Sequence, residues 1–114
     1  MTRALRVLIV DDHRMFTDAL EMLLATEEGV EALGAVGTAA EALELCRQTC
    51  PDVVLMDLDL PGMDGAEATA RVRELCPEAR VVAITGIQDR MLIARAVRAG
   101  ISGFVPKTRA ADEL

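Results

Sequence analysis

The chain has 114 residues, of which 52% are apolar and only 2% aromatic, and its net charge is −7 from 12 basic and 19 acidic residues. This length suits one domain with an aliphatic core. The negative charge and the scarcity of aromatic rings argue against direct nucleic-acid binding by this segment. No apolar run approaches the ~20 residues that span a bilayer, and no signal-peptide cleavage site follows the N-terminus. We therefore expect a cytoplasmic protein without membrane contact.

The three cysteines are Cys46, Cys50 and Cys76. An odd number favours a reducing compartment over a framework of disulfides. Cys46 and Cys50 are four residues apart, which places them on one helical face and predicts that both are small core residues. A metal site built on them is disfavoured, because no further Cys or His has ligand spacing.

Five apolar runs alternate with segments of helical spacing along the chain. The runs predict strands of a parallel sheet over residues 5–10, 30–36, 53–57, 80–84 and 102–106. The run before Asp57 is uninterrupted and bounded by turn residues, which is typical of a strand buried on both faces. The second run is weaker and contains Gly34, which predicts a place towards the edge of the sheet. Short loops and right-handed crossovers then give a doubly wound α/β sheet with helices on both faces.

The segments between the strands predict helices over residues 14–26, from Thr38 to before Pro51, over 66–75 and over 89–99. Thr38 and Glu41 have the spacing of a capping box, and Asp64 is expected to cap the third helix.

Two further expectations concern the fourth helix and a fifth. In the fourth we expect Ile93, Ala94 and Val97 to face inward. Thr108 is placed to cap a fifth helix, but only about two turns remain before Leu114. We therefore expect a truncated fifth helix, with the missing cover supplied by a longer chain or by a partner.

Polar residues follow four of the five strands. Asp11 and Asp12 end the first, Asp57 the third, Thr85 the fourth and Lys107 the fifth. All carboxyl ends of a parallel sheet lie at one edge, so these side chains are expected to converge. Three carboxylates close together require a counter-cation.

Mg²⁺ meets that requirement, because it is a hard ion that binds carboxylate and carbonyl oxygens. Asp57, at the end of the apolar run VVLM, would be a nucleophile able to form an aspartyl phosphate. Lys107 would stabilise the charge of the transferring phosphoryl group, and the Thr85 hydroxyl can donate a hydrogen bond to it. At position 59 the backbone carbonyl, rather than the Asp59 side chain, would face the metal.

The chain resembles the receiver domain of two-component response regulators over residues 5–114. The matching residues are the Asp11–Asp12 pair, Asp57 in LMDLDLPGMDG, Thr85 before the small Gly86, and Lys107 in GFVPK. The stretches DDH and AGISGFVPK are most similar to the LuxR/NarL (FixJ-like) subgroup, which carries a helix-turn-helix output domain. The resemblance implies a flavodoxin-like sheet with the strand order 2-1-3-4-5.

The resemblance also implies roles for the residues at the strand ends. Asp57 would accept the phosphoryl group from the phosphohistidine of a sensor histidine kinase. Asp12, Asp57 and the Asp59 carbonyl would bind Mg²⁺, with Asp11 holding a metal-bound water. Thr85 and Lys107 would contact the phosphoryl group. No enzyme activity is implied beyond self-phosphorylation and autodephosphorylation at Asp57.

A switch and an output are implied as well. Phe104 matches the aromatic residue that turns inward as Thr85 moves. Residues 1–114 would then be the receiver domain alone, and its output would be homodimerisation and DNA binding through a C-terminal domain absent from this chain.

Two other functions remain open at this point. The pair Asp57 and Asp59 resembles the nucleophile and general acid of haloacid-dehalogenase-like phosphohydrolases, although the small size and the Asp11–Asp12 pair argue against that class. The other alternative is a receiver-like module that binds proteins without being phosphorylated. The presence of all three acids, Asp11, Asp12 and Asp57, argues against a module of that kind.

Overall fold

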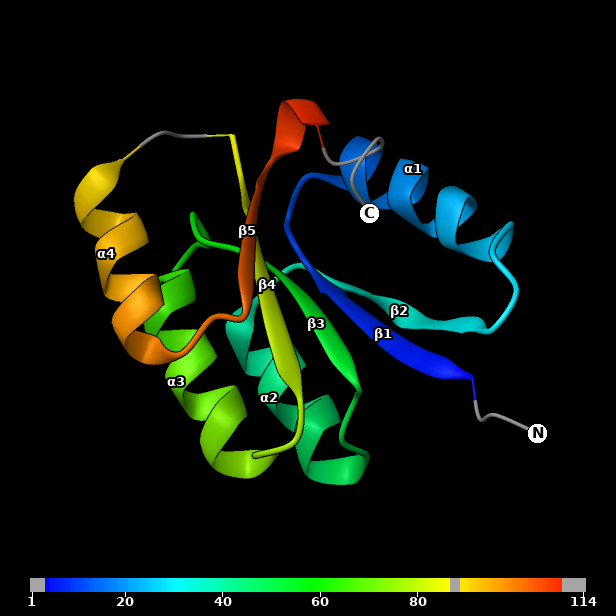
Figure 1. Cartoon of the computed structure of the whole chain (residues 1–114), viewed down its shortest axis with the longest axis horizontal. Coiled ribbons are helices and arrows are strands. Elements are labelled where there is room, and N and C mark those ends of the chain that lie inside the picture. The colour runs from blue at the N-terminus through cyan, green and yellow to red at the C-terminus, as the bar shows by residue number, and fades with distance from the viewer. Residues whose placement is uncertain (1–3, 87–88, 110–114) are drawn as a thin grey trace.

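A computed structural model of the chain describes residues 4–86 and 89–109. Five parallel strands form one sheet in the order β2-β1-β3-β4-β5 (Figure 1), which confirms the predicted architecture. The strands in chain order are β1 (Leu5–Val10), β2 (Val30–Val36), β3 (Val53–Asp57), β4 (Arg80–Thr85) and β5 (Gly103–Pro106).

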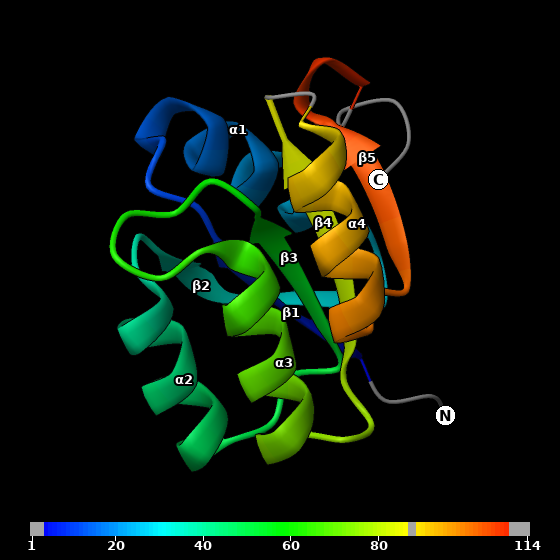
Figure 2. The same ribbon diagram turned by 90° about the vertical axis from the view of Figure 1, so that its left-hand side faces the viewer.

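Helices cover both faces of the sheet. They are α1 (Arg14–Ala25), α2 (Ala39–Gln48), α3 (Gly65–Leu75) and α4 (Arg90–Ala99). Figure 2 shows α2, α3 and α4 side by side in front of the sheet, while α1 lies on the other face. None of the helices in the described residues is long and apolar enough to cross a membrane.

The central strands are buried on both faces, as their continuous apolar sequences predict. Along β1, Leu8 and Val10 pack towards α2 and α3, whereas Val7 and Ile9 pack towards α1. The weaker strand β2 lies at the edge, also as predicted, and the register between β1 and β2 shifts opposite Gly34, whose φ is 138°. The pairings of β1 with β3, β3 with β4 and β4 with β5 show no such shift.

Helix caps fix where the helices begin. Thr38 Oγ1 accepts a hydrogen bond from the Glu41 N–H at 3.2 Å, and Asp64 Oδ1 accepts one from the Glu67 N–H at 2.9 Å. Both caps were predicted from the sequence. Each satisfies a backbone donor that the first helical turn leaves unpaired.

The predicted inward face of α4 is partly wrong. Ala94 and Val97 are exposed and Ile93 is half-buried, whereas Ala96 is completely buried against Leu58 and its neighbours. The helix carries apolar residues on several of its faces, so hydrophobic periodicity alone does not identify the face that packs against the sheet.

The expectation for the cysteines is partly wrong: Cys46 is buried in the core as predicted, but Cys50 is not. Cys50 and Cys76 form a disulfide with their Cα atoms 5.6 Å apart, and among the described residues only Cys46 is a free cysteine. Cys50 lies beyond the end of α2 and is exposed, so it does not share a buried helical face with Cys46. Sequence spacing did not indicate this pairing because the two residues meet only after α2 and α3 pack side by side.

The chain after β5 forms a short 3₁₀ turn over Lys107–Arg109. The predicted fifth helix falls mainly on residues 110–114, which lie outside the described residues.

Gly65 is predicted to be sensitive to any side chain. A β-carbon at this position would lie 2.5 Å from the Leu58 Cα and 2.6 Å from the Asp57 carbonyl oxygen. We expect Gly65→Ala to lower the free energy of unfolding by about 1–3 kcal/mol, because backbone atoms must move to admit the methyl group. Gly103→Ala is the matched control, since a β-carbon added there would meet nothing within 4 Å. Equal denaturation midpoints for the two variants would contradict this account.

Candidate phosphoacceptor site

The carboxyl edge of the sheet brings together the side chains predicted to converge there. Lys107 Nζ lies 2.8 Å from Asp11 Oδ2 and 3.2 Å from Asp57 Oδ2. The Asp11 and Asp57 side chains are 0% and 1% exposed, and that of Lys107 is 15% exposed. One ammonium group therefore lies between two buried carboxylates that come from different strands.

Backbone hydrogen bonds position both acidic residues. The Asp11 N–H donates to the Val36 carbonyl at 2.9 Å, which holds the end of β1 against β2. Asp57 Oδ1 accepts a hydrogen bond from the Asp59 N–H at 3.0 Å, and the Leu58 N–H donates to the Ile84 carbonyl at 3.2 Å. The loop after β3 thus orients the Asp57 carboxylate before any ligand binds.

The pKa values of the two buried acids shift in opposite directions. Burial raises the pKa of Asp57, and the nearby Asp11 charge raises it further, against the opposing hydrogen bonds from Asp59 and Lys107. Burial also acts to raise the pKa of Asp11, but the Lys107 ammonium and the hydrogen bonds with His13 outweigh it and the net pKa is lowered. A cation added to this edge would favour the ionised form of both groups.

His13 is part of this cluster, which the sequence did not predict. Its side chain is 60% exposed, as expected of a loop residue, yet its Nδ1 lies 2.8 Å from Asp11 Oδ1 and 2.8 Å from Lys107 Nζ. The hydrogen bond to Asp11 raises the pKa of the imidazole. The sequence signal was the position of His13 directly after the acidic pair, but adjacency does not show which way the ring turns.

The cluster suits a divalent cation. Asp11, Asp12, His13 and Asp57 each offer a ligand atom within 4.8 Å of the others. Asp11 Oδ2 is buried and accepts no hydrogen bond of good geometry, although it pairs with Lys107. Three carboxylates match the hard-ion preference of Mg²⁺ better than that of a softer metal.

The other predicted residues lie at the end of β4, in the loop after β3 and in β5. Thr85 ends β4 and is 3% exposed, and the Asp59 side chain is exposed to solvent. Phe104 is half-buried and packs beside Ala83 and Ala96, on the α4 side of the sheet.

Phe16 was not predicted as a site residue, although its ring centroid lies 4.9 Å from Lys107 Nζ. A cation over an aromatic face is attracted to it. Phe16 comes from α1 and Lys107 from the opposite end of the chain, so only the folded structure brings them together.

A cavity of about 420 Å³ opens onto the cluster. His13, Asp57, Asp59 and Lys107 are among the residues that line it. A ligand entering this cavity would meet the Asp57 carboxylate and the Lys107 ammonium together, beside the negative charge of Asp59.

Comparison with known proteins agrees with this architecture. The family model of the response regulator receiver domain matches residues 7–114. The transcriptional regulatory protein MctR of Rhizobium johnstonii is 36% identical over 110 residues, which are 96% of this chain and 51% of that protein. The chain thus spans about half the length of this curated relative.

Solved structures show the same fold. A LuxR-family two-component response regulator from Aurantimonas sp. SI85-9A1 has a TM-score of 0.87 and 36% identity, covering 98% of this chain and 79% of that one. A response regulator from Burkholderia pseudomallei, solved with a phosphorylated aspartic acid and a calcium ion, has a TM-score of 0.81 and 25% identity, covering 90% and 59%. The chain belongs to the response regulator receiver domain family, and LuxR-family regulators are among its relatives.

Proposed function

We propose that the chain is a phosphoacceptor switch in which Asp57 receives a phosphoryl group from the phosphohistidine of a sensor histidine kinase. The observation that carries this proposal is the buried Asp57 carboxylate at the end of β3, 3.2 Å from Lys107 Nζ and beside the buried Asp11. The Burkholderia neighbour, whose structure holds a phosphorylated aspartic acid, supports the same chemistry.

Mg²⁺ is the proposed cofactor. Asp12, Asp57 and the backbone carbonyl of Asp59 would hold the ion, and Asp11 would hold one of its waters. When bound, the ion would neutralise the acidic cluster and the negative charge of the phosphoryl oxygens.

The chain's own residues account for the transfer step. A carboxylate oxygen of Asp57 attacks the phosphorus, the O–P bond forms, and the N–P bond to the donor histidine breaks with its electron pair returning to the imidazole. The Asp59 N–H orients the attacking carboxylate by its 3.0 Å hydrogen bond. Lys107, which pairs with Asp11 in the structure, would turn to stabilise the charge on the phosphoryl oxygens, and Thr85 would donate a hydrogen bond to one of them.

Phosphorylation would then act on a two-state equilibrium. Thr85 lies at the end of β4, and Phe104 lies on the neighbouring strand β5. In the proposed switch Thr85 moves towards the phosphoryl group and Phe104 turns inward. That change would alter the surface formed by α4 and β5.

The output would be transcriptional. Residues 1–114 would form the receiver domain of a cytoplasmic regulator, and DNA binding would belong to a helix-turn-helix domain outside this sequence. The name of MctR and the LuxR-family neighbour support this proposal. Homodimerisation on phosphorylation would couple the two domains.

Fluoroberyllate, a phosphoryl mimic, tests the proposal. With Mg²⁺ it should raise the melting temperature of the wild-type chain and leave Asp57→Ala unchanged, whereas the exposed Asp59→Asn should still respond. A wild-type-like response in Asp57→Ala would contradict the phosphoacceptor role. Steady turnover of phosphate esters would favour the phosphohydrolase alternative, and absence of Mg²⁺ binding at millimolar concentration would favour the non-phosphorylated binding module.

A further inference from the structure

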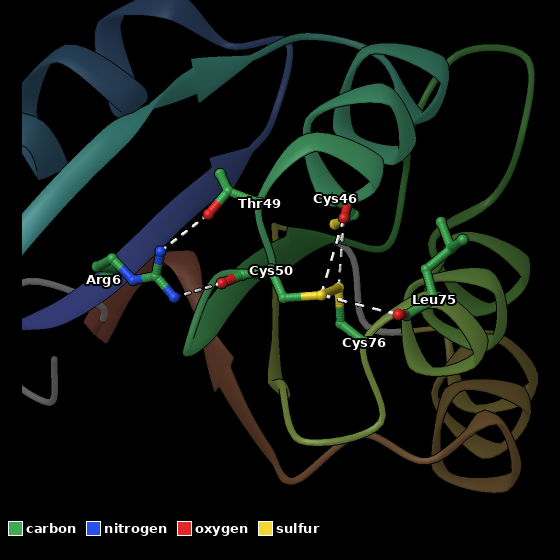
Figure 3. The surroundings of a disulfide bond; sticks show 6 residues. All are labelled: Arg6, Cys46, Thr49, Cys50, Leu75 and Cys76. Atoms are coloured by element: carbon green, nitrogen blue, oxygen red, sulfur yellow. Dashed lines mark hydrogen bonds between the residues drawn. A yellow bond between two sulfur atoms is a disulfide. The ribbon is translucent and has the colours of Figure 1, made fainter.

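The Cys50–Cys76 disulfide lies at the end of the sheet opposite the acidic cluster. Cys50 follows α2 and precedes β3, while Cys76 caps the end of α3 and precedes β4 (Figure 3). The strands are parallel, so the bond joins the segments that lead into their amino ends, whereas Asp57 and Thr85 stand at their carboxyl ends. None of the residues of the proposed phosphoacceptor site takes part in it.

The two sulfur atoms differ in accessibility. Cys50 is exposed, whereas Cys76 is 2% exposed. Both residues line a cavity of about 220 Å³, together with Arg6, Pro51 and Pro77 among others. A small thiol can therefore approach Cys50, and Cys76 is the sulfur that leaves.

The surroundings also suit the reduced pair. Cys50 Sγ lies 3.8 Å from the Cys46 carbonyl and 3.7 Å from the Leu75 carbonyl, and Cys76 Sγ lies 3.6 Å from the Cys46 carbonyl (Figure 3). A disulfide has no S–H to donate, but two thiols would find these helix-end carbonyls ready to accept. Reduction would thus not leave the buried sulfur without a partner.

Arg6 holds Cys50 in place independently of the bond between the sulfurs. Its guanidinium donates to the Cys50 carbonyl at 2.7 Å and to Thr49 Oγ1 at 2.9 Å (Figure 3). The backbone around Cys50 is therefore anchored to β1 in either redox state. The two sulfurs would stay close after reduction and could pair again.

Cys46 does not compete for this chemistry. It is buried, and burial raises the pKa of its thiol. A protonated, inaccessible thiol is a poor nucleophile, so exchange is confined to the other two cysteines.

We propose that Cys50–Cys76 is a reversible thiol–disulfide exchange site at which low-molecular-weight thiols attack Cys50. The thiolate forms a mixed disulfide with Cys50 Sγ, the Cys50–Cys76 bond breaks, and Cys76 Sγ keeps the electron pair and takes a proton. A second thiolate attacks the incoming sulfur of the mixed disulfide and releases the Cys50 thiol. Two small thiols are thereby oxidised to their disulfide while the protein's disulfide is reduced to two thiols.

This exchange acts on the segment that carries the phosphoacceptor. The disulfide closes the chain from residue 50 to residue 76, which includes β3, Asp57 and α3. Opening the loop frees the unfolded chain more than the folded one. Reduction should therefore lower the stability of the domain, and a cytoplasmic setting would favour such a transient pair over a permanent one.

Peptide mapping of the 114-residue chain tests the pairing. Trypsin cuts after Arg47, Arg71 and Arg73, so the three cysteines fall in the separate peptides 15–47, 48–71 and 74–80. After equilibration with glutathione disulfide we expect 48–71 linked to 74–80, and with added glutathione a mixed disulfide on 48–71. Any other linkage, or glutathione found on 15–47 or 74–80 instead, would overturn the proposal.

A thermal measurement tests whether reduction of the disulfide lowers the stability of the domain. Dithiothreitol should lower the melting temperature of the oxidised wild type by roughly 10 °C, and reoxidation with glutathione disulfide should restore it. Cys50→Ser, whose new hydroxyl is exposed, should fold and show no such response. An unchanged wild-type melting temperature, or an equal shift in Cys50→Ser, would contradict the proposal. Neither experiment depends on phosphorylation, so its failure is distinct from failure of the proposed function.

Discussion

Replacing Asp57 by asparagine is expected to abolish phosphoryl acceptance and, in magnesium-free buffer, to stabilise the fold by about 1 kcal/mol. The amide lacks the nucleophilic carboxylate but keeps its shape, so the 3.0 Å hydrogen bond from the Asp59 N–H can persist. The variant also removes one of two buried negative charges that share Lys107. Activity and stability should therefore move in opposite directions, which a general folding defect would not produce.

The stabilisation should depend on pH. Burial raises the pKa of Asp57 in the folded state above its ordinary value of 3.8. A raised carboxyl pKa contributes stability that is present below the unfolded-state pKa and is lost as the pH rises through the folded-state value. The advantage of Asp57→Asn should thus be small near pH 3.8 and grow as the pH rises above it.

Urea denaturation from acidic to neutral pH measures this difference, with Asp59→Asn as the control because its side chain is exposed. If the difference in free energy of unfolding between Asp57→Asn and the wild type were the same at every pH, the raised pKa of Asp57 would not be its cause. Residual phosphorylation of Asp57→Asn would contradict the role itself.

Replacing Lys107 by methionine is expected to cost about 3 kcal/mol of stability without magnesium. Methionine keeps most of the side-chain volume but leaves Asp11 and Asp57, 0% and 1% exposed, without the ammonium group between them. The same change should slow phosphoryl acceptance at least ~100-fold, because the charge of the phosphoryl group loses its ammonium partner.

Magnesium should separate these two effects. A divalent cation bound by the carboxylates would replace the lost positive charge, so Mg²⁺ should restore more stability to Lys107→Met than it adds to the wild type. Phosphoryl acceptance should remain slow. Lys107→Arg is the matched control, since it keeps the charge while changing its shape. If Mg²⁺ stabilised Lys107→Met no more than the wild type, the carboxylates would not be the metal ligands proposed here.

The polar residues at the strand ends could be predicted from two features of the sequence. The apolar run before Asp57 identified a buried strand, and the parallel arrangement placed Asp11, Asp57 and Lys107 at one edge. The strand order, which makes β1 and β3 neighbours, was implied by the resemblance to receiver domains. The residue pattern predicted that these side chains share one edge, and the resemblance supplied the order of the strands that carry them.

What could not be predicted depends on rotation and packing. Ala96 rather than Val97 is buried because α4 rotates to pack beside α3, and its sequence is apolar on several faces. The ring of His13 turns towards Asp11 although its position in a loop allows either direction. Cys50 and Cys76 are 26 residues apart and meet only through the packing of α2 and α3. In each case the deciding contact is distant in sequence.

The most direct test of the central claim is to trap the phosphorylated residue. The chain would be treated with a small acyl phosphate donor and Mg²⁺, reduced with borohydride, which converts an aspartyl phosphate to homoserine, and digested with trypsin. We predict homoserine at position 57 of the peptide 48–71, only when Mg²⁺ is present. Homoserine at position 52, 59 or 64 of that peptide with Asp57 unmodified, or none at all, would contradict the account.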